Sequence, residues 1–312
     1  MKANTITTTN NGIEVIQDTE ALLKQWSSYI DASERTVCSY TKAVKRFLTY
    51  LQANNITAPT REDVLAYKKE MQITLAPSSV QLNIVALRAF FEWAEQSGIY
   101  PNIAKRIKGM KINPSYKKDD LSIDSLKCIL ATIDTTTNKG KRDYALFLLL
   151  STCGLRTIEA TRANVEDVRS TGNKTVLYIH GKGQTDKTEF VVIPYEVEQA
   201  LRVYLRTRTP QEQEPLFASV SNHKADGGRL TTRSIRRLIK EYMVNAGYDS
   251  KRLTTHSLRH SAVTISIASG IPLDVVQAFA RHKNIATTML YNHRVQKINN
   301  PCSNAIAGAI SL

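Results

Sequence analysis

Residues 255–291, THSLRHSAVTISIASGIPLDVVQAFARHKNIATTMLY, carry the strongest signal in this sequence. A helix is predicted at the start of this stretch, and its first turns hold the motif HSLRH. His256 and Arg259 are three residues apart, so both side chains project from one helix face toward a common ligand. His282 and Tyr291 follow. Each residue alone has an ordinary structural explanation, but the set predicts a reactive site.

Two segments upstream add polar residues at turns. Arg156 follows a glycine turn in GLRTIEA, and Glu159 lies one helical turn further on. Lys182 lies in GKG, between the strand-like stretches TVLYIH (residues 175–180) and FVVI (residues 190–193). This arrangement predicts a β-hairpin with Lys182 in its turn. The second half of the chain is therefore predicted to be mostly helical with a small sheet.

The first hundred residues predict a helical bundle. Four amphipathic helices are expected to begin near Asp18, Ser33, Thr60 and Pro77, because apolar residues recur there every three to four positions. Four such helices in a segment of this length would form a small bundle.

A basic segment, residues 105–118, follows the predicted bundle and contains no acidic residue. Its composition predicts a flexible linker between two domains, residues 18–104 and residues 119–295. The linker would lie along DNA phosphates, and a solvated basic loop is an equally good interpretation. The DNA-binding residues predicted in this segment are Lys105, Arg106, Lys108 and Lys111.

Composition limits the function further. The 312 residues suit two domains, and 42 Lys and Arg against 28 Asp and Glu give a net charge of +14. This surplus favours a polyanionic partner, DNA or RNA; a merely basic protein or a binder of anionic membranes is the alternative. No apolar run approaches the roughly 18 residues that span a bilayer, and the four cysteines form no CxxC pair. The sequence therefore predicts no membrane partner, no metal site and no secretory signal. Residues 1–17 are expected to form a flexible polar arm, and the protein is expected to be cytoplasmic.

The ordered set GLRTIEA, GKG, HSLRH and RHKNIATTMLY resembles the signature of the tyrosine recombinase (lambda integrase-like) family, which includes the XerC and XerD recombinases. The first half of the chain is similar to the family's core-binding domain through the pattern SxxTxxxYxxxxxxF at Ser33, Thr36, Tyr40 and Phe47. The resemblance implies a mainly α fold. It would consist of a SAM-like helical DNA-binding bundle, a mixed α/β catalytic domain of the DNA breaking-rejoining type, and a C-terminal tail, residues 296–312, that exchanges a helix with a neighbouring subunit. A helix packed on its own domain is an equally good interpretation of this tail.

The resemblance also implies catalytic roles. Tyr291 would be the nucleophile, His256 the base that takes its proton, and Lys182 the general acid for the leaving 5′ oxygen. His282 would hydrogen-bond the scissile phosphate, and Glu159 would orient the arginines.

Chemistry supports a pair of arginines at such a site. Attack on phosphorus builds negative charge on the non-bridging oxygens, and guanidiniums meet it with forked donors that stay protonated. Arg156 and Arg259 are therefore the predicted clamp. No acidic cluster of the kind that holds Mg²⁺ is visible in the sequence, so a reaction without metal, other cofactor or ATP is expected.

One position departs from the family. The usual Gly before the second histidine is Arg281 here. Arg281 is predicted either to shift the local turn or to add a phosphate contact, and it is counted among the DNA-binding residues.

The partners implied by the resemblance are double-stranded DNA with an inverted-repeat core site and a homotetramer on two such sites, or a heterotetramer with a related recombinase, in the bacterial nucleoid. Two alternatives remain open at this point. A monomeric type IB topoisomerase would share the tyrosine chemistry, although such enzymes resemble a Lys-x-x-Arg pattern where this chain has His256 and Arg259. A DNA-binding protein of the same fold without catalysis is the other alternative.

Overall fold

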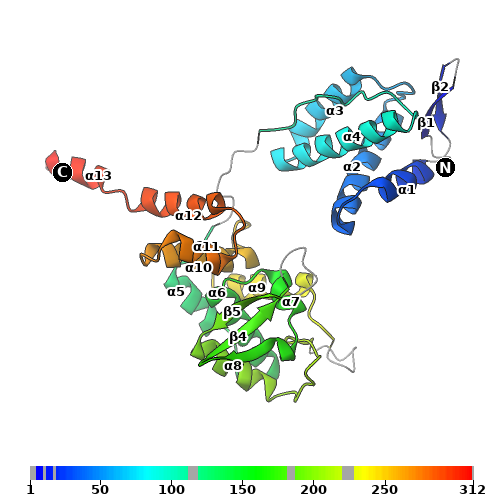
Figure 1. Cartoon of the computed structure of the whole chain (residues 1–312). Helices are drawn as coiled ribbons and strands as arrows, with labels where there is room; N and C mark the ends of the chain where they lie inside the picture. Colours follow the sequence, from blue (N-terminus) through cyan, green and yellow to red (C-terminus); the bar gives the residue numbers. More distant parts are fainter. Residues whose placement is uncertain are drawn as a thin grey trace. The chain divides into compact units, whose positions relative to one another are not determined.

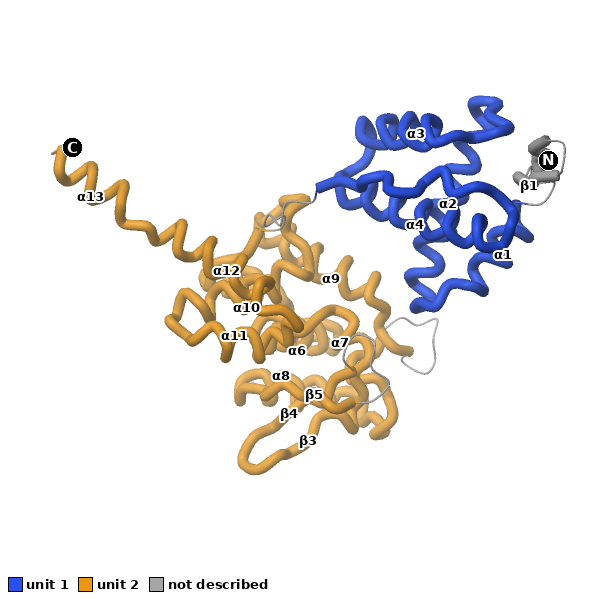
Figure 2. The backbone as a smooth tube through the Cα atoms, turned by 45° about the horizontal axis from the view of Figure 1, so that its top comes forward, with its two compact units in different colours: residues 1–113 blue, residues 114–312 orange. Residues whose placement is uncertain are grey.

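The computed structural model describes residues 19–111, 119–180, 187–219 and 228–310, together with the backbone of residues 5–9 and 12–16. The chain divides into two compact units, residues 1–113 and residues 114–312 (Figure 2). Near the N-terminus, β1 (Thr5–Thr9) pairs antiparallel with β2 (Gly12–Ile16). The flexibility expected for residues 1–17 stays a prediction.

The described residues of the first unit form four helices, as the sequence predicts. They are α1 (Thr19–Tyr29), α2 (Glu34–Ala53), α3 (Arg61–Thr74) and α4 (Pro77–Gln96). Local signals fix their starts: the Ser33 side chain accepts the amide of Thr36, and Thr60 and Asp63 form a capping box. Aromatic rings fill the core, where the centroids of Trp26 and Phe90 lie 5.2 Å apart in an edge-on arrangement.

The described part of the basic segment packs on this first unit. Ile107 is buried in its core, and Met110 packs against the same cluster. The Lys68 ammonium donates to the carbonyl of Lys108 at 2.6 Å, and the Arg61 guanidinium donates to the carbonyl of Lys105. The side chains predicted to bind DNA here are exposed: Lys105, Arg106, Lys108 and Lys111. Their role and the linker itself stay predictions, because residues 112–118 lie outside the described residues.

The second unit is mainly helical with one small sheet (Figure 1). Its elements are α5 (Ile123–Ala131), α6 (Asn138–Thr152), α7 (Thr157–Arg162), the 3-10 turn η1 (Val165–Asp167), β3 (Val168–Thr171), β4 (Lys174–Ile179), β5 (Glu189–Ile193), α8 (Tyr195–Leu205), α9 (Thr232–Asn245), α10 (Thr255–Ala268), α11 (Leu273–Ala280), α12 (Ile285–Ile298) and α13 (Cys302–Ala309). The fold class expected from the sequence is confirmed.

The sheet is antiparallel with the strand order β3-β4-β5. The predicted hairpin is β4 and β5, in which Leu177 faces Val191, and β3 adds a strand that the sequence reasoning missed. The apolar helix α6 packs against α8 and α10, and its residues Leu146, Phe147 and Leu149 are fully buried in the core of the unit. The hairpin turn with Lys182 lies outside the described residues.

A second, smaller apolar cluster joins α10, α11 and α12. It contains Val263, Val276, Ala280 and Tyr291. By contrast, α13 has no buried residue. None of the helices in the part of the chain that the structure describes is long and apolar enough to cross a bilayer.

The first described residues of the second unit are bound to this helical layer. The Leu121 amide donates to the Ser261 hydroxyl on α10 at 2.7 Å. Asp120 forms an ion pair of 2.6 Å with Arg294 on α12, one turn after Tyr291. The start of the unit is therefore fixed to the helix that carries the tyrosine.

Candidate active site

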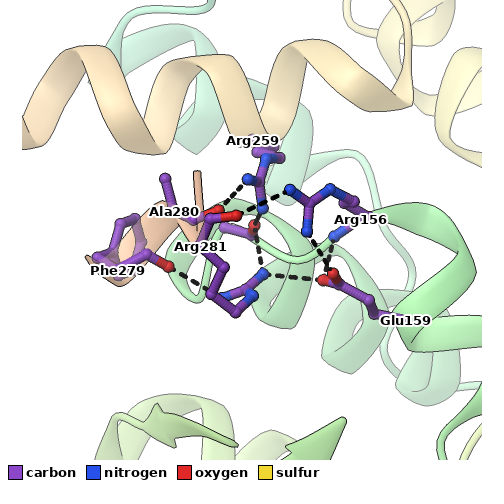
Figure 3. Close-up of polar contacts among 7 residues, drawn as sticks. Arg156, Glu159, Arg259, Phe279, Ala280 and Arg281 are labelled. Carbon is purple, nitrogen blue, oxygen red and sulfur yellow. Dashed lines mark hydrogen bonds and ion pairs between the residues drawn. The ribbon is translucent and has the colours of Figure 1, made fainter. Parts of the chain in front are cut away.

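Two turns position the predicted arginine clamp (Figure 3). Arg156 is the N-cap of α7 and follows Gly154, whose φ of +56° is a left-handed conformation suited to glycine. Arg259 lies in the first turns of α10 and is buried. Its guanidinium donates to the carbonyl of Gly154 at 2.5 Å and to the carbonyl of Ala280 at the end of α11. Segments more than 100 residues apart in sequence therefore converge on one side chain.

Glu159 holds the arginines together. Its carboxylate accepts hydrogen bonds from the Arg156 guanidinium at 2.8 Å and from the Arg156 backbone amide at 2.7 Å. The same carboxylate accepts the Arg281 guanidinium at 2.8 Å. Glu159 is only 2% exposed. These contacts hold Arg156 in place, while the orienting role predicted for Glu159 stays a prediction.

Arg281 takes the backbone conformation that the family's glycine would favour. It caps α11 in the left-handed region, with φ 53° and ψ 46°. Its carbonyl accepts the Arg156 guanidinium at 3.1 Å, and its own guanidinium donates to the carbonyl of Phe279 at 2.9 Å as well as to Glu159. The side chain is 8% exposed, and its Nε has no hydrogen-bond partner among the described residues. Both predictions for Arg281, a shifted turn and a phosphate contact, stay predictions.

Arg156, Arg259 and Arg281 form what we call the arginine cluster. Within the described ranges, Glu159 is the one carboxylate that forms an ion pair with it, so three positive charges and one negative leave a net charge of +2. Burial, followed by the charges of Arg156 and Arg281, lowers the pKa of Arg259 to about 9. Concentrated, partly desolvated positive charge of this kind stabilises a bound oxyanion.

Tyr291 lies on α12 beside three histidines. Its hydroxyl is hydrogen-bonded to Nδ1 of His260, and its ring stacks on His282 with centroids 5.9 Å apart and planes inclined by 21°. The His256 ring meets His260 edge-on at 4.5 Å. Burial raises the pKa of Tyr291 to about 12, against the opposing fields of Arg259 and Arg156. The phenol therefore lies within the electrostatic range of both predicted clamp residues, in the same chain.

The two inner histidines are held neutral. Burial, with His256 as the next cause, lowers the pKa of His260 to about 3. Burial, with Arg259 next, lowers the pKa of His282 to about 4. Nδ1 of His282 is bonded to the Thr288 hydroxyl at 3.0 Å, which fixes its ring.

The structure thus brings five of the six predicted catalytic residues into one region of the second unit: Arg156, His256, Arg259, His282 and Tyr291. The sixth, Lys182, lies outside the described residues. The imidazole that bonds to the tyrosine is His260, whereas the sequence reasoning gave His256 as its proton acceptor. His260 was missed, although it is the last residue of HSLRH and lies one turn from His256 on the same helix face. Across the ranges that the structure describes, no group of three or more His, Cys, Asp or Glu side chains is placed to hold a metal ion.

Comparison with known proteins places this site in a family. Residues 120–297 match the phage integrase family, and residues 23–98 match the phage integrase N-terminal SAM-like domain. The chain therefore belongs to the phage integrase family. It is 30% identical over 268 residues to the tyrosine recombinase XerD of Staphylococcus epidermidis, a match that covers 84% of this chain and 88% of the relative. The protein is an enzyme of the tyrosine recombinase class that transfers DNA strands.

Further relatives and solved structures agree. Tyrosine recombinase XerD of Lacticaseibacillus casei is 29% identical over 281 residues, covering 87% of this chain and 93% of the relative. The fold is similar to that of the XerH site-specific recombinase bound to palindromic difH substrate in a post-cleavage complex. The TM-score is 0.73 at 19% sequence identity, and the match covers 92% of this chain and 84% of that chain. It is also similar to a lambda integrase dimer bound to a COC′ core site, with a TM-score of 0.65, 16% identity, and coverage of 86% and 96%.

Proposed function

We propose that this enzyme cleaves and rejoins double-stranded DNA at a specific site through a covalent 3′-phosphotyrosine at Tyr291. The observation that carries the proposal is that two members of the arginine cluster, Arg156 and Arg259, act electrostatically on the buried phenol of Tyr291 in one chain, where His260, the neighbour of Arg259, is bonded to the hydroxyl. A cationic site beside a nucleophile is what attack on an anionic phosphodiester requires.

In the proposed reaction the Tyr291 oxygen attacks phosphorus and the bond from phosphorus to the 5′ oxygen breaks. The phenol proton passes to an imidazole, for which His256 is the predicted base, and the leaving oxygen takes a proton from Lys182. Arg156 and Arg259 bind the non-bridging oxygens as their charge grows, and His282 donates a further hydrogen bond to the phosphate.

The second half of the reaction reverses the first. The 5′ hydroxyl of another strand attacks the phosphotyrosine and restores the phosphodiester, so that neither ATP nor a metal ion is consumed. Exchange of two pairs of strands in turn passes through a Holliday junction.

The assembly we propose is a homotetramer on two inverted-repeat sites in the bacterial nucleoid. The XerH and lambda integrase structures are complexes with DNA sites, which supports DNA as the partner here. In α13 no residue is buried, and Ile306 is 60% exposed. An apolar helix with no buried side chain among the described residues suits exchange into a neighbouring subunit. A mixed assembly with a related recombinase would use the same helix.

Trapping the intermediate tests the reaction. A nicked duplex that loses its 5′ hydroxyl fragment should accumulate a covalent protein–DNA adduct with the wild type and none with Tyr291→Phe. Relaxation of plasmids without intermolecular products would indicate a type IB topoisomerase instead. Absence of any adduct on DNA that the protein binds would indicate a DNA-binding protein without catalysis.

A further inference from the structure

His260 is outside the set of predicted catalytic residues, yet its imidazole is hydrogen-bonded to the hydroxyl of the proposed nucleophile. It follows Arg259 on α10, and its ring lies between His256, at 4.5 Å, and Tyr291, at 5.3 Å. Its Nδ1 is bonded to the Tyr291 hydroxyl. This hydrogen bond thus joins the two helices α10 and α12 beside the apolar cluster that they share.

The groups around this hydrogen bond keep both of its partners neutral. Charges of His256, Arg259, His282 and Arg294 all oppose a positive charge on His260, and burial opposes it more strongly than any of them. The phenol faces Arg259, Arg156 and Asp120, and burial keeps it protonated. The pKa of about 3 for His260 lies far below the pKa of about 12 for Tyr291, so the proton stays on the phenol. With both groups neutral, Tyr291 donates and Nδ1 of His260 accepts in the tautomer that carries the histidine proton on Nε2.

An acceptor that does not take the proton has a different task from a general base. Rotation of the phenol away from His260 would break this hydrogen bond in a buried environment, which is costly. The bond consequently fixes the ring torsion of Tyr291 while His282 covers one face of the ring at 5.9 Å. The hydroxyl is held in one direction before DNA is bound.

We propose that His260 is a positioning residue for the nucleophile, which aims the protonated Tyr291 hydroxyl through Nδ1 and leaves removal of the proton to another group. This inference rests on the proposed function, because it takes Tyr291 to be the nucleophile. Accurate placement of a reacting atom contributes to rate without contributing to DNA affinity.

Two substitutions separate positioning from general stability. His260→Asn offers its amide oxygen near the place of Nδ1, whereas His260→Gln offers it near Nε2, away from the tyrosine. His293→Gln on the exposed side of α12 is the matched control. The substrate is a nicked duplex that the full-length protein itself selects from a random-sequence library, and single-turnover adduct formation is measured together with the dissociation constant for the same duplex.

We expect His260→Gln to slow adduct formation at least about fivefold, the value of one hydrogen bond, with unchanged DNA affinity. His260→Asn and His293→Gln should stay within about twofold of the wild type, a difference too small for loss of one such bond. Equal rates for the Gln variant and the wild type would overturn the inference, as would equal slowing by Asn and Gln. An unreactive wild type would overturn the proposed function instead.

A measurement on the wild type covers the case in which His260→Gln does not fold. Nitrogen-15 NMR of histidine-labelled protein at pH 7 should show Nδ1 of His260 unprotonated, with a resonance that moves in Tyr291→Phe. A protonated Nδ1, or a resonance that does not respond to loss of the hydroxyl, would overturn the inference without any bearing on DNA cleavage.

Discussion

Replacing Glu159 with Gln should destabilise the second unit more than any surface charge change. The substitution raises the net charge of the arginine cluster from +2 to +3 and replaces an acceptor of three hydrogen bonds with a group that has one acceptor oxygen. Removing one partner from a buried ion pair costs about 3–5 kcal/mol, and the remaining amide oxygen places the expected loss near the lower value, about 3 kcal/mol. In a unit of this size, that corresponds to a melting temperature lower by about 6–12 °C.

Calorimetry of the full-length protein measures this loss, and Asp249→Asn is the control. Asp249 forms an ion pair of 3.1 Å with Lys240 but is 74% exposed, so its loss should cost less than about 1 kcal/mol. Inorganic phosphate should raise the melting temperature of Glu159→Gln more than that of the wild type, because an oxyanion then replaces the missing carboxylate. If Glu159→Gln melts no lower than Asp249→Asn, the carboxylate does not neutralise the cluster and the electrostatic account of the site is wrong.

Three further substitutions test the surroundings of the site. Gly154→Ala should lower the melting temperature more than Gly172→Ala. Both glycines have a positive φ, which costs an Ala about 1–2 kcal/mol, but a Cβ at Gly154 would also meet the Phe279 ring at 3.0 Å. Equal losses of melting temperature in the two variants would show that this contact has no effect. Because the pKa of His260 is lowered to about 3, the unfolded chain binds a proton below about pH 6.5 that the folded chain does not. The free energy of unfolding should therefore fall toward acid pH by at most about 1.4 kcal/mol per pH unit. Urea unfolding at pH 7 and pH 5 should show a smaller fall for His260→Asn than for the wild type. Arg156→Ala should bind DNA but form no adduct, as gel shift and trapping would show; parallel loss of both would refute its role in the clamp.

The sequence predicts helices well where caps and apolar spacing agree. Ser33, Thr60 and Pro77 all mark observed helix starts, because each satisfies or avoids an amide that the first turn leaves unpaired. The short strand β3 was missed, since four residues with three exposed side chains show no alternation of apolar and polar positions. Ile107 was likewise hidden in a run of basic residues that reads as linker, although it is buried in the first unit.

The reactive groups could be named from motif order, but their contacts could not. Nothing in the order of residues shows that Arg281 turns back onto Glu159, because that contact depends on where the end of α11 meets the turn at Gly154. The order of residues likewise does not show whether His256 or His260 is the hydrogen-bond partner of Tyr291. Both lie on one face of α10, and the packing of α12 decides which imidazole meets the hydroxyl.

The ion pair between Asp120 and Arg294 has a practical consequence for anyone who isolates the second unit. A fragment that begins at residue 122 would lack Asp120, leave the Arg294 guanidinium without this partner and expose the apolar surface that Leu121 covers. Such a fragment would lack the contacts of residues 120 and 121 that stabilise the helix layer carrying Tyr291. Expression boundaries placed before residue 119 keep those contacts intact.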